Sequence, residues 1–241
     1  MIPAHRATML LAPLLLAAPV AMSGDRVVCV DVPVAIPDNN PDGVAVSLDV
    51  GNASGLSVTQ VRLDLVATHP WVGDLRVVLT APSGAMVVLL DRPGMPSVGF
   101  PGPFGCGGDN IDATFIDSAT ADAESTCSTT LVPVLSDPLR PLEPLAAFEG
   151  GAAEGVWTLT VADLSVADAG TLVSVCLTLS TAPACPADLA EPFGSLNFFD
   201  LAAFLSLFQT GDPAADLAAP TGVFNFFDLS AYLSLYNAGC P

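Results

Sequence analysis

The sequence is poor in positive charge. It contains no lysine, and six arginines stand against 25 aspartates and glutamates, so the 241-residue chain has a formal net charge of −19. A surface of this sign repels phosphate backbones and anionic lipid headgroups, which argues against nucleic acids and membrane insertion. An excess of carboxylates either keeps a protein soluble or binds a hard cation such as calcium, and charge alone does not separate the two roles.

The sequence also lacks the motifs of common hydrolases. Neither Gly-x-Ser-x-Gly nor His-Glu-x-x-His occurs, and the only histidines are His5 and His69. A serine triad needs a histidine base, and His69 is the one candidate once the N-terminal leader is removed. Because His69 stands next to Pro70 at the end of an alternating apolar segment, we interpret it as structural. The sequence therefore predicts no catalytic residues and no enzyme.

Apolar runs long enough to span a membrane are missing. The longest, Met9–Val20, follows the basic Arg6, is broken by two prolines and is shorter than the roughly 20 residues of a membrane helix. Small residues follow at Ala21 and Ser23. This is the pattern of a signal peptide over residues 1–23, so we expect a secreted protein, extracellular or at the cell surface.

Cys-x-x-Cys pairs are absent as well, although six cysteines are present. In an exported chain this favours three disulfides over a metal site. The layout indicates the pairs: two cysteines near the ends of a first domain, two around a polar loop and two around the C-terminal segment, that is Cys29–Cys176, Cys106–Cys127 and Cys185–Cys240.

What the sequence has in residues 27–181 is an apolar pattern of period two. Val44, Val46, Leu48 and Val50 alternate with small or polar residues, and similar segments recur to residue 179. Such alternation buries one face of each strand. The segment 81–84, Ala-Pro-Ser-Gly, is typical of a type I turn between two strands. The sequence predicts a mostly β protein, an antiparallel β-sandwich.

The same region resembles the P domain (Homo B domain) of proprotein convertases. Seven motifs occur in the order of that family: Val34–Asp38, His69–Leu75, Leu79–Gly84, Cys106–Asn110, Leu145–Gly150, Gly155–Leu159 and Asp163–Leu172. The resemblance implies a jelly-roll (galactose-binding-like) β-sandwich. In convertases this domain lies beside a subtilisin-like protease, supports its folding and is not itself the catalyst.

Oxygen-bearing side chains cluster in the cysteine-bracketed loop of this domain. Asp109, Asn110, Asp112 and Asp117 fall within nine residues. Oxygen ligands this close in sequence favour a calcium site. The alternative is that each side chain accepts a hydrogen bond from nearby backbone amides.

Residues 185–241 contain a repeat. The segment 188–207 returns as 216–235, with every matched pair 28 positions apart. Each copy is a loop followed by an amphipathic helix, with one apolar face formed by Leu201, Phe204, Leu205 and Phe208 in the first copy and by Leu229, Tyr232, Leu233 and Tyr236 in the second. Such short helices are unstable alone, so the two faces should pack together.

The repeat resembles a dockerin, the calcium-binding anchoring module that binds cohesins, and in particular a GC-type dockerin, after the ending Gly239-Cys240-Pro241. The resemblance implies Ca²⁺ as a cofactor. Its ligands would be Asp188, Glu191, Asn197 and Asp200 in the first loop, and Asp216, Asn225 and Asp228 in the second. Ordinary dockerin loops carry further acidic or amide residues near their start; here Asp188 and Asp216 lie one residue early. The alternative is that Asp200 and Asp228 are helix N-caps.

Three functions follow from these patterns. The first is a non-catalytic secreted binding protein, anchored through its dockerin-like module to a cohesin-like or cell-surface protein. The second is an accessory or folding domain of a subtilisin-like serine endopeptidase system. The third is a carbohydrate- or glycoprotein-binding module, although two tryptophans and two tyrosines offer few platforms for a glycan.

Overall fold

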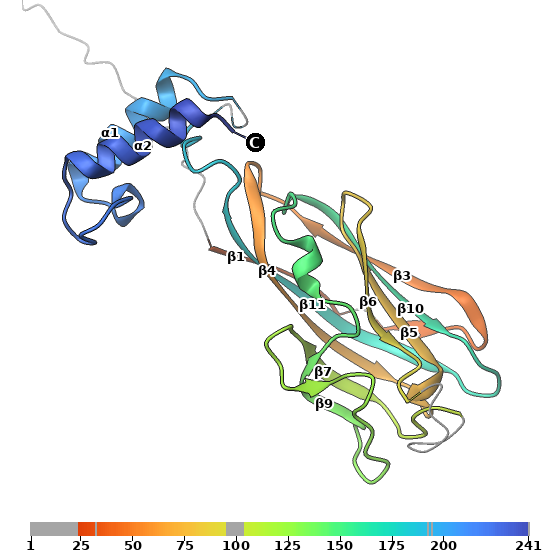
Figure 1. Cartoon of the computed structure of the whole chain (residues 1–241). Coiled ribbons are helices and arrows are strands. Elements are labelled where there is room, and N and C mark those ends of the chain that lie inside the picture. The colour runs from red at the N-terminus through yellow and green to blue at the C-terminus, as the bar shows by residue number, and fades with distance from the viewer. Residues whose placement is uncertain (1–23, 32, 95–103, 192, 194, 241) are drawn as a thin grey trace, which may run out of the picture.

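A computed structural model describes residues 24–31, 33–94, 104–191, 193 and 195–240. The expected signal peptide, residues 1–23, lies outside this part. Eleven strands form two facing sheets, and two helices follow them at the C-terminus (Figure 1). The expectation of a mostly β protein with a small helical module is confirmed at this level; the jelly-roll and dockerin assignments stay predictions.

The larger sheet has the order β1-β11-β4-β7-β9-β8, with β2 also paired to β11. Its strands are β1 (Gly24–Val30), β2 (Val34–Ile36), β4 (Leu56–Thr68), β7 (Ile111–Phe115), β8 (Ala121–Asp122), β9 (Leu135–Arg140) and β11 (Gly170–Pro183). The smaller sheet has the order β3-β10-β5-β6. Its strands are β3 (Asn40–Val50), β5 (Leu75–Thr80), β6 (Met86–Asp91) and β10 (Gly155–Asp163).

The core lies between the sheets and is built from the alternating positions. Leu48 on β3 and Leu159 on β10 are fully buried, whereas their neighbours along each strand are partly or fully exposed. Trp157 packs edge-on against Phe148 with ring centroids 5.0 Å apart, and its Nε1 donates to the Ala153 carbonyl at 3.0 Å. The period-two pattern therefore predicted the buried face correctly.

The expectation of a purely antiparallel sandwich is wrong at one edge. Strand β9 pairs with both β7 and β8 in parallel. Parallel neighbours need a crossover, and the long connection between β7 and β9 supplies it. Near this edge, Cys106–Cys127 ties the connection back to the segment that precedes β7.

All three expected disulfides are present, namely Cys29–Cys176, Cys106–Cys127 and Cys185–Cys240. The first joins residues that lie directly opposite each other on β1 and β11. The last closes the C-terminal segment, whose core of buried residues is separate from that of the sandwich.

The C-terminal helices are α1 (Phe198–Thr210) and α2 (Phe226–Ala238), and three short 3-10 turns complete the chain: η1 (Val72–Asp74), η2 (Leu145–Phe148) and η3 (Pro213–Ala215). The helices pack through Phe204 and Tyr232, as the sequence predicts. The predicted face is wrong by one position in each helix, since Leu205 and Leu233 are 46% exposed. In α1, Leu207 packs against the core instead.

The helical segment begins where the larger sheet ends. The Ala184 amide, directly after β11, donates to the Gly55 carbonyl at 2.8 Å. Phe193 lies so close to Gly55 that a Cβ there would be 3.0 Å from it. Among the described residues, no helix is long and apolar enough to cross a membrane.

Candidate functional site

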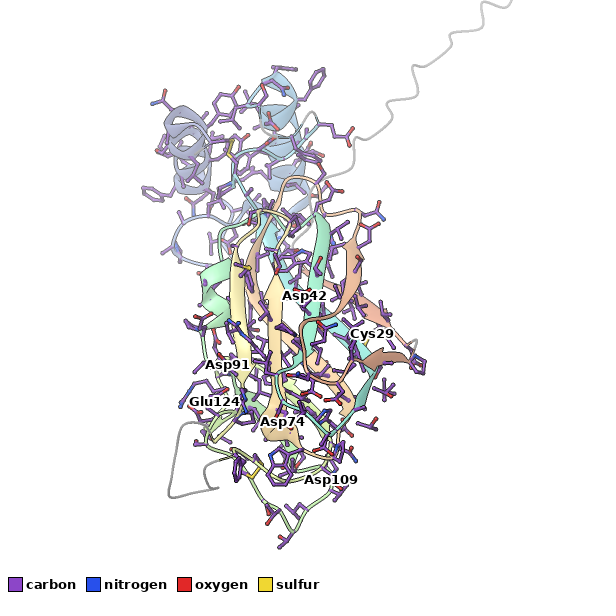
Figure 2. All side chains as sticks on the ribbon, turned by 90° about the vertical axis from the view of Figure 1, so that its right-hand side faces the viewer. Cys29, Asp42, Asp74, Asp91, Asp109 and Glu124 are labelled. Carbon is purple, nitrogen blue, oxygen red and sulfur yellow. A yellow bond between two sulfur atoms is a disulfide. The ribbon has the colours of Figure 1, made fainter. Side chains whose placement is uncertain are left out.

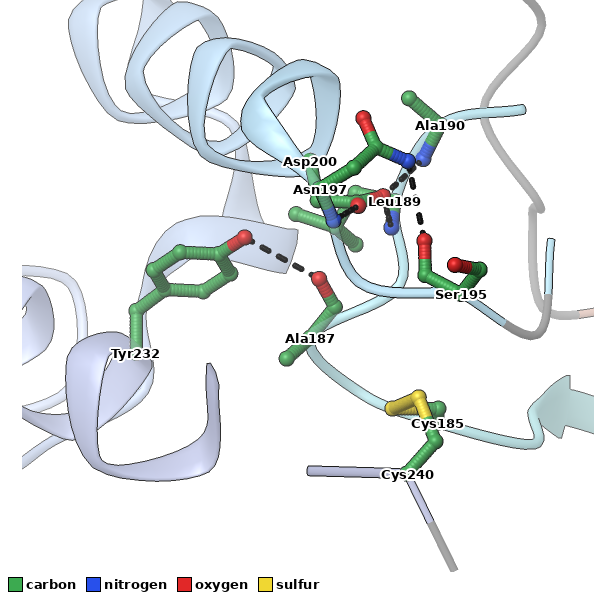
Figure 3. Close-up of a disulfide and its surroundings, with 9 residues drawn as sticks. All are labelled: Cys185, Ala187, Leu189, Ala190, Ser195, Asn197, Asp200, Tyr232 and Cys240. Atoms are coloured by element: carbon green, nitrogen blue, oxygen red, sulfur yellow. Dashed lines mark hydrogen bonds between the residues drawn. A yellow bond between two sulfur atoms is a disulfide. The ribbon is translucent and has the colours of Figure 1, made fainter. Parts of the chain in front are cut away.

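Asp200 closes the first loop of the repeat (Figure 3). Its Oδ1 accepts hydrogen bonds from the amides of Leu189 at 2.9 Å and Ala190 at 2.8 Å, and its Oδ2 accepts one from the Asn197 amide at 2.7 Å. The side chain is fully buried. A carboxylate at N3 of a helix also lies favourably in the helix dipole. One side chain thus ties both ends of the loop to the start of α1.

Asn197 is the N-cap of α1. Its Oδ1 accepts from the Phe199 amide at 2.8 Å, and its Nδ2 donates to the Ser195 carbonyl at 2.9 Å. With Asp200 at N3 it forms a capping box. The alternative of Asp200 as the N-cap is therefore corrected: the cap is the asparagine, and the aspartate is its N3 partner.

The second loop repeats this arrangement. Asp228 accepts from Leu217 at 2.9 Å, Ala218 at 2.8 Å and Asn225 at 2.8 Å, and Asn225 caps α2. The amide of Asn225, followed by those of Ala218 and Leu217, lowers the pKa of Asp228 against the opposing effect of desolvation. The carboxylate is therefore held in its charged form.

The remaining expected calcium ligands differ in burial and in their hydrogen bonds. Glu191 is exposed, while Asp188 is buried in the loop. Asp216 accepts from the Gly222 amide through Oδ2, and its buried Oδ1 has no hydrogen-bond partner. Within the described ranges, no three histidine, cysteine or carboxylate side chains are arranged to hold a metal ion. Calcium takes roughly six to eight oxygens, and in both loops the closing aspartate already accepts three backbone amides.

The acidic group of the first domain is spread along a strand. Asp109 precedes β7 and Asp117 follows it, and a strand of this length spans about 16 Å. Asn110 accepts from the His69 amide at 3.0 Å, and Asp112 is exposed on β7. Both oxygens of Asp117 accept backbone amides at the start of η2, each at 2.8 Å. The structure does not bring these four side chains together, and the backbone-capping alternative describes Asp117.

His69 is buried in a polar cluster between the sheets. Its Nε2 lies 3.2 Å from Asp163 Oδ2, and its Nδ1 lies 2.8 Å from the carbonyl oxygen and 3.1 Å from the amide nitrogen of Trp71. Both side chains are fully buried. Each ring nitrogen therefore has a partner inside the protein, and neither faces a space that a substrate could enter. Sequence analysis placed Asp163 in a family motif but did not predict its contact with His69, which lies 94 positions away.

Two further carboxyls in this region have raised pKa values. Burial raises the pKa of Asp74, the negative charge of Asp163 adds to this, and Arg92 opposes it. Burial raises the pKa of Glu124 to about 7, while the Asp91 amide, which donates to it at 2.6 Å, opposes the shift. Figure 2 shows Asp91 and Glu124 close together at one edge of the sandwich. Sequence analysis missed Glu124, which lies in no motif, and did not predict the burial of Asp74 within the His69–Leu75 motif.

A shallow pocket of about 570 Å³ lies on the outer face of the larger sheet, next to β4, β7 and β9. Its lining contains no aromatic residue: Arg62, Thr114, Ile116, Ser118, Ala119, Thr120, Ala121, Asp137 and Pro138. A glycan site usually offers an aromatic face, so this pocket gives the carbohydrate-binding alternative no support.

Exposed phenylalanines mark the beginning of each C-terminal helix. Phe198 and Phe226 are both 73% exposed, and Phe199 and Phe227 are both 63% exposed. In each pair the two rings lie edge to face. The internal repeat thus presents the same apolar pair twice, on a segment in which every charged side chain is a carboxylate. Exposed apolar patches on proteins occur at protein and membrane interaction sites and in ligand-binding grooves.

Comparisons with known proteins place the sandwich in a family. Two solved structures match part of the chain: a serine protease of Aeromonas sobria, with 17% identity and a TM-score of 0.41, and that protease in complex with its chaperone ORF2, with 16% identity and a TM-score of 0.39. Each match covers 68% of this chain and 28% of the other. No curated protein matches significantly. The proprotein convertase P-domain model matches residues 58–179, which is half of the sequence, and the chain therefore belongs to the proprotein convertase P-domain family.

Proposed function

We propose that the protein is a secreted, non-catalytic accessory component of a subtilisin-like serine endopeptidase system. The observation that carries this proposal is the match of the P-domain family to residues 58–179. P domains are accessory to serine proteases and do not catalyse. The sandwich itself offers no histidine base for a protease, because its one histidine, His69, lies against Asp163 and Trp71.

The disulfides support the extracellular site of action. Three pairs of cysteines are oxidised, and such bonds persist in oxidising compartments. A rigid, cross-linked sandwich is suited to act as a folding platform for a partner in a compartment where proteases are active.

Anchoring through the C-terminal segment is a second candidate function. Its support is the four exposed phenylalanines at the starts of α1 and α2, which no described part of the chain covers. The acidic character of the segment suits a partner whose apolar groove has a basic rim, as a cohesin-like or cell-surface protein could offer. Anchoring would keep the P domain where the protease is released.

Co-expression tests the accessory role. The mature protein is produced with the catalytic domain of a subtilisin-like endopeptidase secreted by the same organism, and the yield of active protease and its co-elution with the P-domain protein are measured. We expect a higher yield and a stable complex. Unchanged yield together with separate elution would overturn the proposal.

A matched variant separates the two candidate functions. Replacing all four exposed phenylalanines by serine leaves the P domain untouched, so the effect on protease yield should persist while retention at the cell surface is lost. Loss of the protease effect in this variant would assign that effect to the helical segment instead. Unchanged surface retention would exclude anchoring through the phenylalanines.

A further inference from the structure

Both loops of the C-terminal repeat are closed by the same device, a buried aspartate at N3 of the following helix. Asp200 holds the amides of Leu189 and Ala190 at the start of its loop and that of Asn197 at the end. These amides lie up to eleven positions from the carboxylate that binds them. In an EF-hand-type loop, a cation draws the start and end of the loop together. Here a carboxylate does so.

The two loops make these bonds almost identically. Asp228 binds its two loop-start amides at 2.9 and 2.8 Å, as Asp200 does, and the third distance is 2.8 Å against 2.7 Å. The loops differ elsewhere, since Glu191 in the first corresponds to Ala219 in the second. The arrangement therefore does not depend on a carboxylate at that position.

A cation would have to compete with these bonds. A carboxylate has about four lone-pair directions, and three of those of Asp228 point at backbone amides. The amide oxygen of Asn225 is likewise engaged by the Phe227 amide. Binding an ion through either group would compete with these bonds, which are partly buried at Asp228 and exposed at Asn225.

The one orphaned oxygen in the second loop does not alter this balance. Oδ1 of Asp216 is buried without a hydrogen-bond partner. Near the start of the same loop, Leu217, Ala219 and Thr221 supply one side-chain oxygen, the hydroxyl of Thr221. A single carboxylate oxygen falls far short of the roughly six to eight ligands of calcium.

We infer that the C-terminal module is a calcium-independent variant of the dockerin modules that it resembles. In it, hydrogen bonds to Asp200 and Asp228 close the loops in place of a bound cation. These hydrogen bonds are charge-assisted and end on fully buried carboxylates, which makes them strong enough to organise a short loop. The anchoring helices are then presented in the same conformation whatever the concentration of divalent cations outside the cell.

Thermal unfolding of the full mature protein tests this inference. The two tyrosines, Tyr232 and Tyr236, lie in the module and both tryptophans lie in the sandwich, so near-ultraviolet tyrosine signals report on the module within the intact chain. We expect its midpoint in 5 mM calcium chloride and in chelator to agree within about 1 °C, because no cation-binding equilibrium contributes. Calorimetric titration with calcium should show no site of millimolar or tighter affinity.

Two substitutions distinguish the aspartate bonds from a metal site. Asp228→Asn replaces an acceptor oxygen by an NH₂ group that cannot bind the Asn225 amide, and should lower the tyrosine-reported midpoint by about 5 °C or more in calcium and chelator alike. Asp216→Asn keeps an oxygen for the Gly222 amide and should shift it by less than about 2 °C. A wild-type midpoint that rises by several degrees in calcium, with the rise abolished in both variants, would overturn the inference.

The calorimetric titration of the wild-type protein with calcium tests the inference even if a variant fails to fold. Heat released at a one- or two-site stoichiometry on adding calcium to the intact protein would show that the loops hold the ion, and would restore the metal site that the sequence predicts. Absence of heat, together with equal midpoints, supports closure by the aspartates.

Discussion

The ring of Phe204 lies parallel to that of Tyr232, with the centroids 4.0 Å apart and the planes 9° apart. The two residues occupy equivalent positions of the 28-residue repeat, so this stack joins the two halves of the C-terminal module. The Tyr232 hydroxyl donates to the Ala187 carbonyl at 3.0 Å, and burial raises the pKa of this phenol so that it stays protonated. The stack therefore holds both helices and the entry segment together.

Truncating this stack should unfold the module while leaving the sandwich intact. Phe204→Ala removes a fully buried ring, and we expect it to cost about 3–5 kcal/mol in the free energy of unfolding of the module. Tyr232→Phe is the matched control, since it keeps the stack and loses one hydrogen bond, at about 1 kcal/mol. Tyrosine signals in urea titrations measure both. Equal losses in the two variants would contradict the role of the stack.

His69 should matter for stability and not for turnover. His69→Ala leaves the buried Asp163 carboxylate without its ring partner, and removing the partner of a buried polar group costs about 1–3 kcal/mol. We expect the tryptophan-reported unfolding midpoint of the sandwich to fall accordingly. Incubation of the wild-type protein with a peptide library should give cleavage at background level.

The matched control is the double change His69→Ala with Asp163→Ala, which removes the stranded charge and should recover part of the lost stability. Reproducible peptide cleavage that disappears in His69→Ala would contradict the assignment of a structural histidine.

Glu124 should make the sandwich less stable as the pH rises from about 4.5 to 7. Its pKa is about 7 in the folded protein against an ordinary value of 4.5, because burial disfavours the charged form. The folded chain binds this proton more tightly, so the contribution is full below pH 4.5 and is lost as the pH rises through 7. Because the group is partly exposed, we expect a loss on the order of 1–2 kcal/mol.

Glu124→Gln keeps an oxygen for the Asp91 amide and has no charge to bury. It should remove most of this pH slope and stabilise the sandwich at pH 8, as measured by tryptophan fluorescence in urea at several pH values. A variant with the wild-type slope would show that another group is responsible.

Much of this architecture could be predicted because it depends on local pattern. Alternating apolar residues define the buried face of β3 and β10, and the spacing around Phe204 and Tyr232 defines the helix contact. The parallel pairing of β9 could not be predicted, since it depends on where a long connection returns to the sheet. The pairing of His69 with Asp163 likewise links segments 94 positions apart.

The role of Asp200 shows a different limit. Calcium ligation and backbone capping use the same residue types at the same spacing, so the sequence left both readings open. In the folded loop the amides of Leu189 and Ala190 point at Asp200, an orientation that the sequence does not specify.

The stability of the C-terminal module should change with pH in the opposite sense to that of the sandwich. Backbone amides, that of Asn225 foremost, lower the pKa of Asp228, so the folded module holds this carboxylate charged more strongly than the unfolded chain does. The contribution of Asp228 is therefore present above the ordinary aspartate value near 3.8 and is lost as the pH falls through the lower folded value. We expect the tyrosine-reported midpoint to be flat between pH 5 and 7 and to fall in more acidic solution. Asp228→Asn should lower the midpoint at pH 7 and flatten its acid dependence.

The tryptophan-reported midpoint of the same samples should instead rise between pH 7 and 5, as Glu124 binds its proton. A single common pH profile for both reporters would mean that the two parts unfold as one unit, and the separate assignments of Asp228 and Glu124 would fail together.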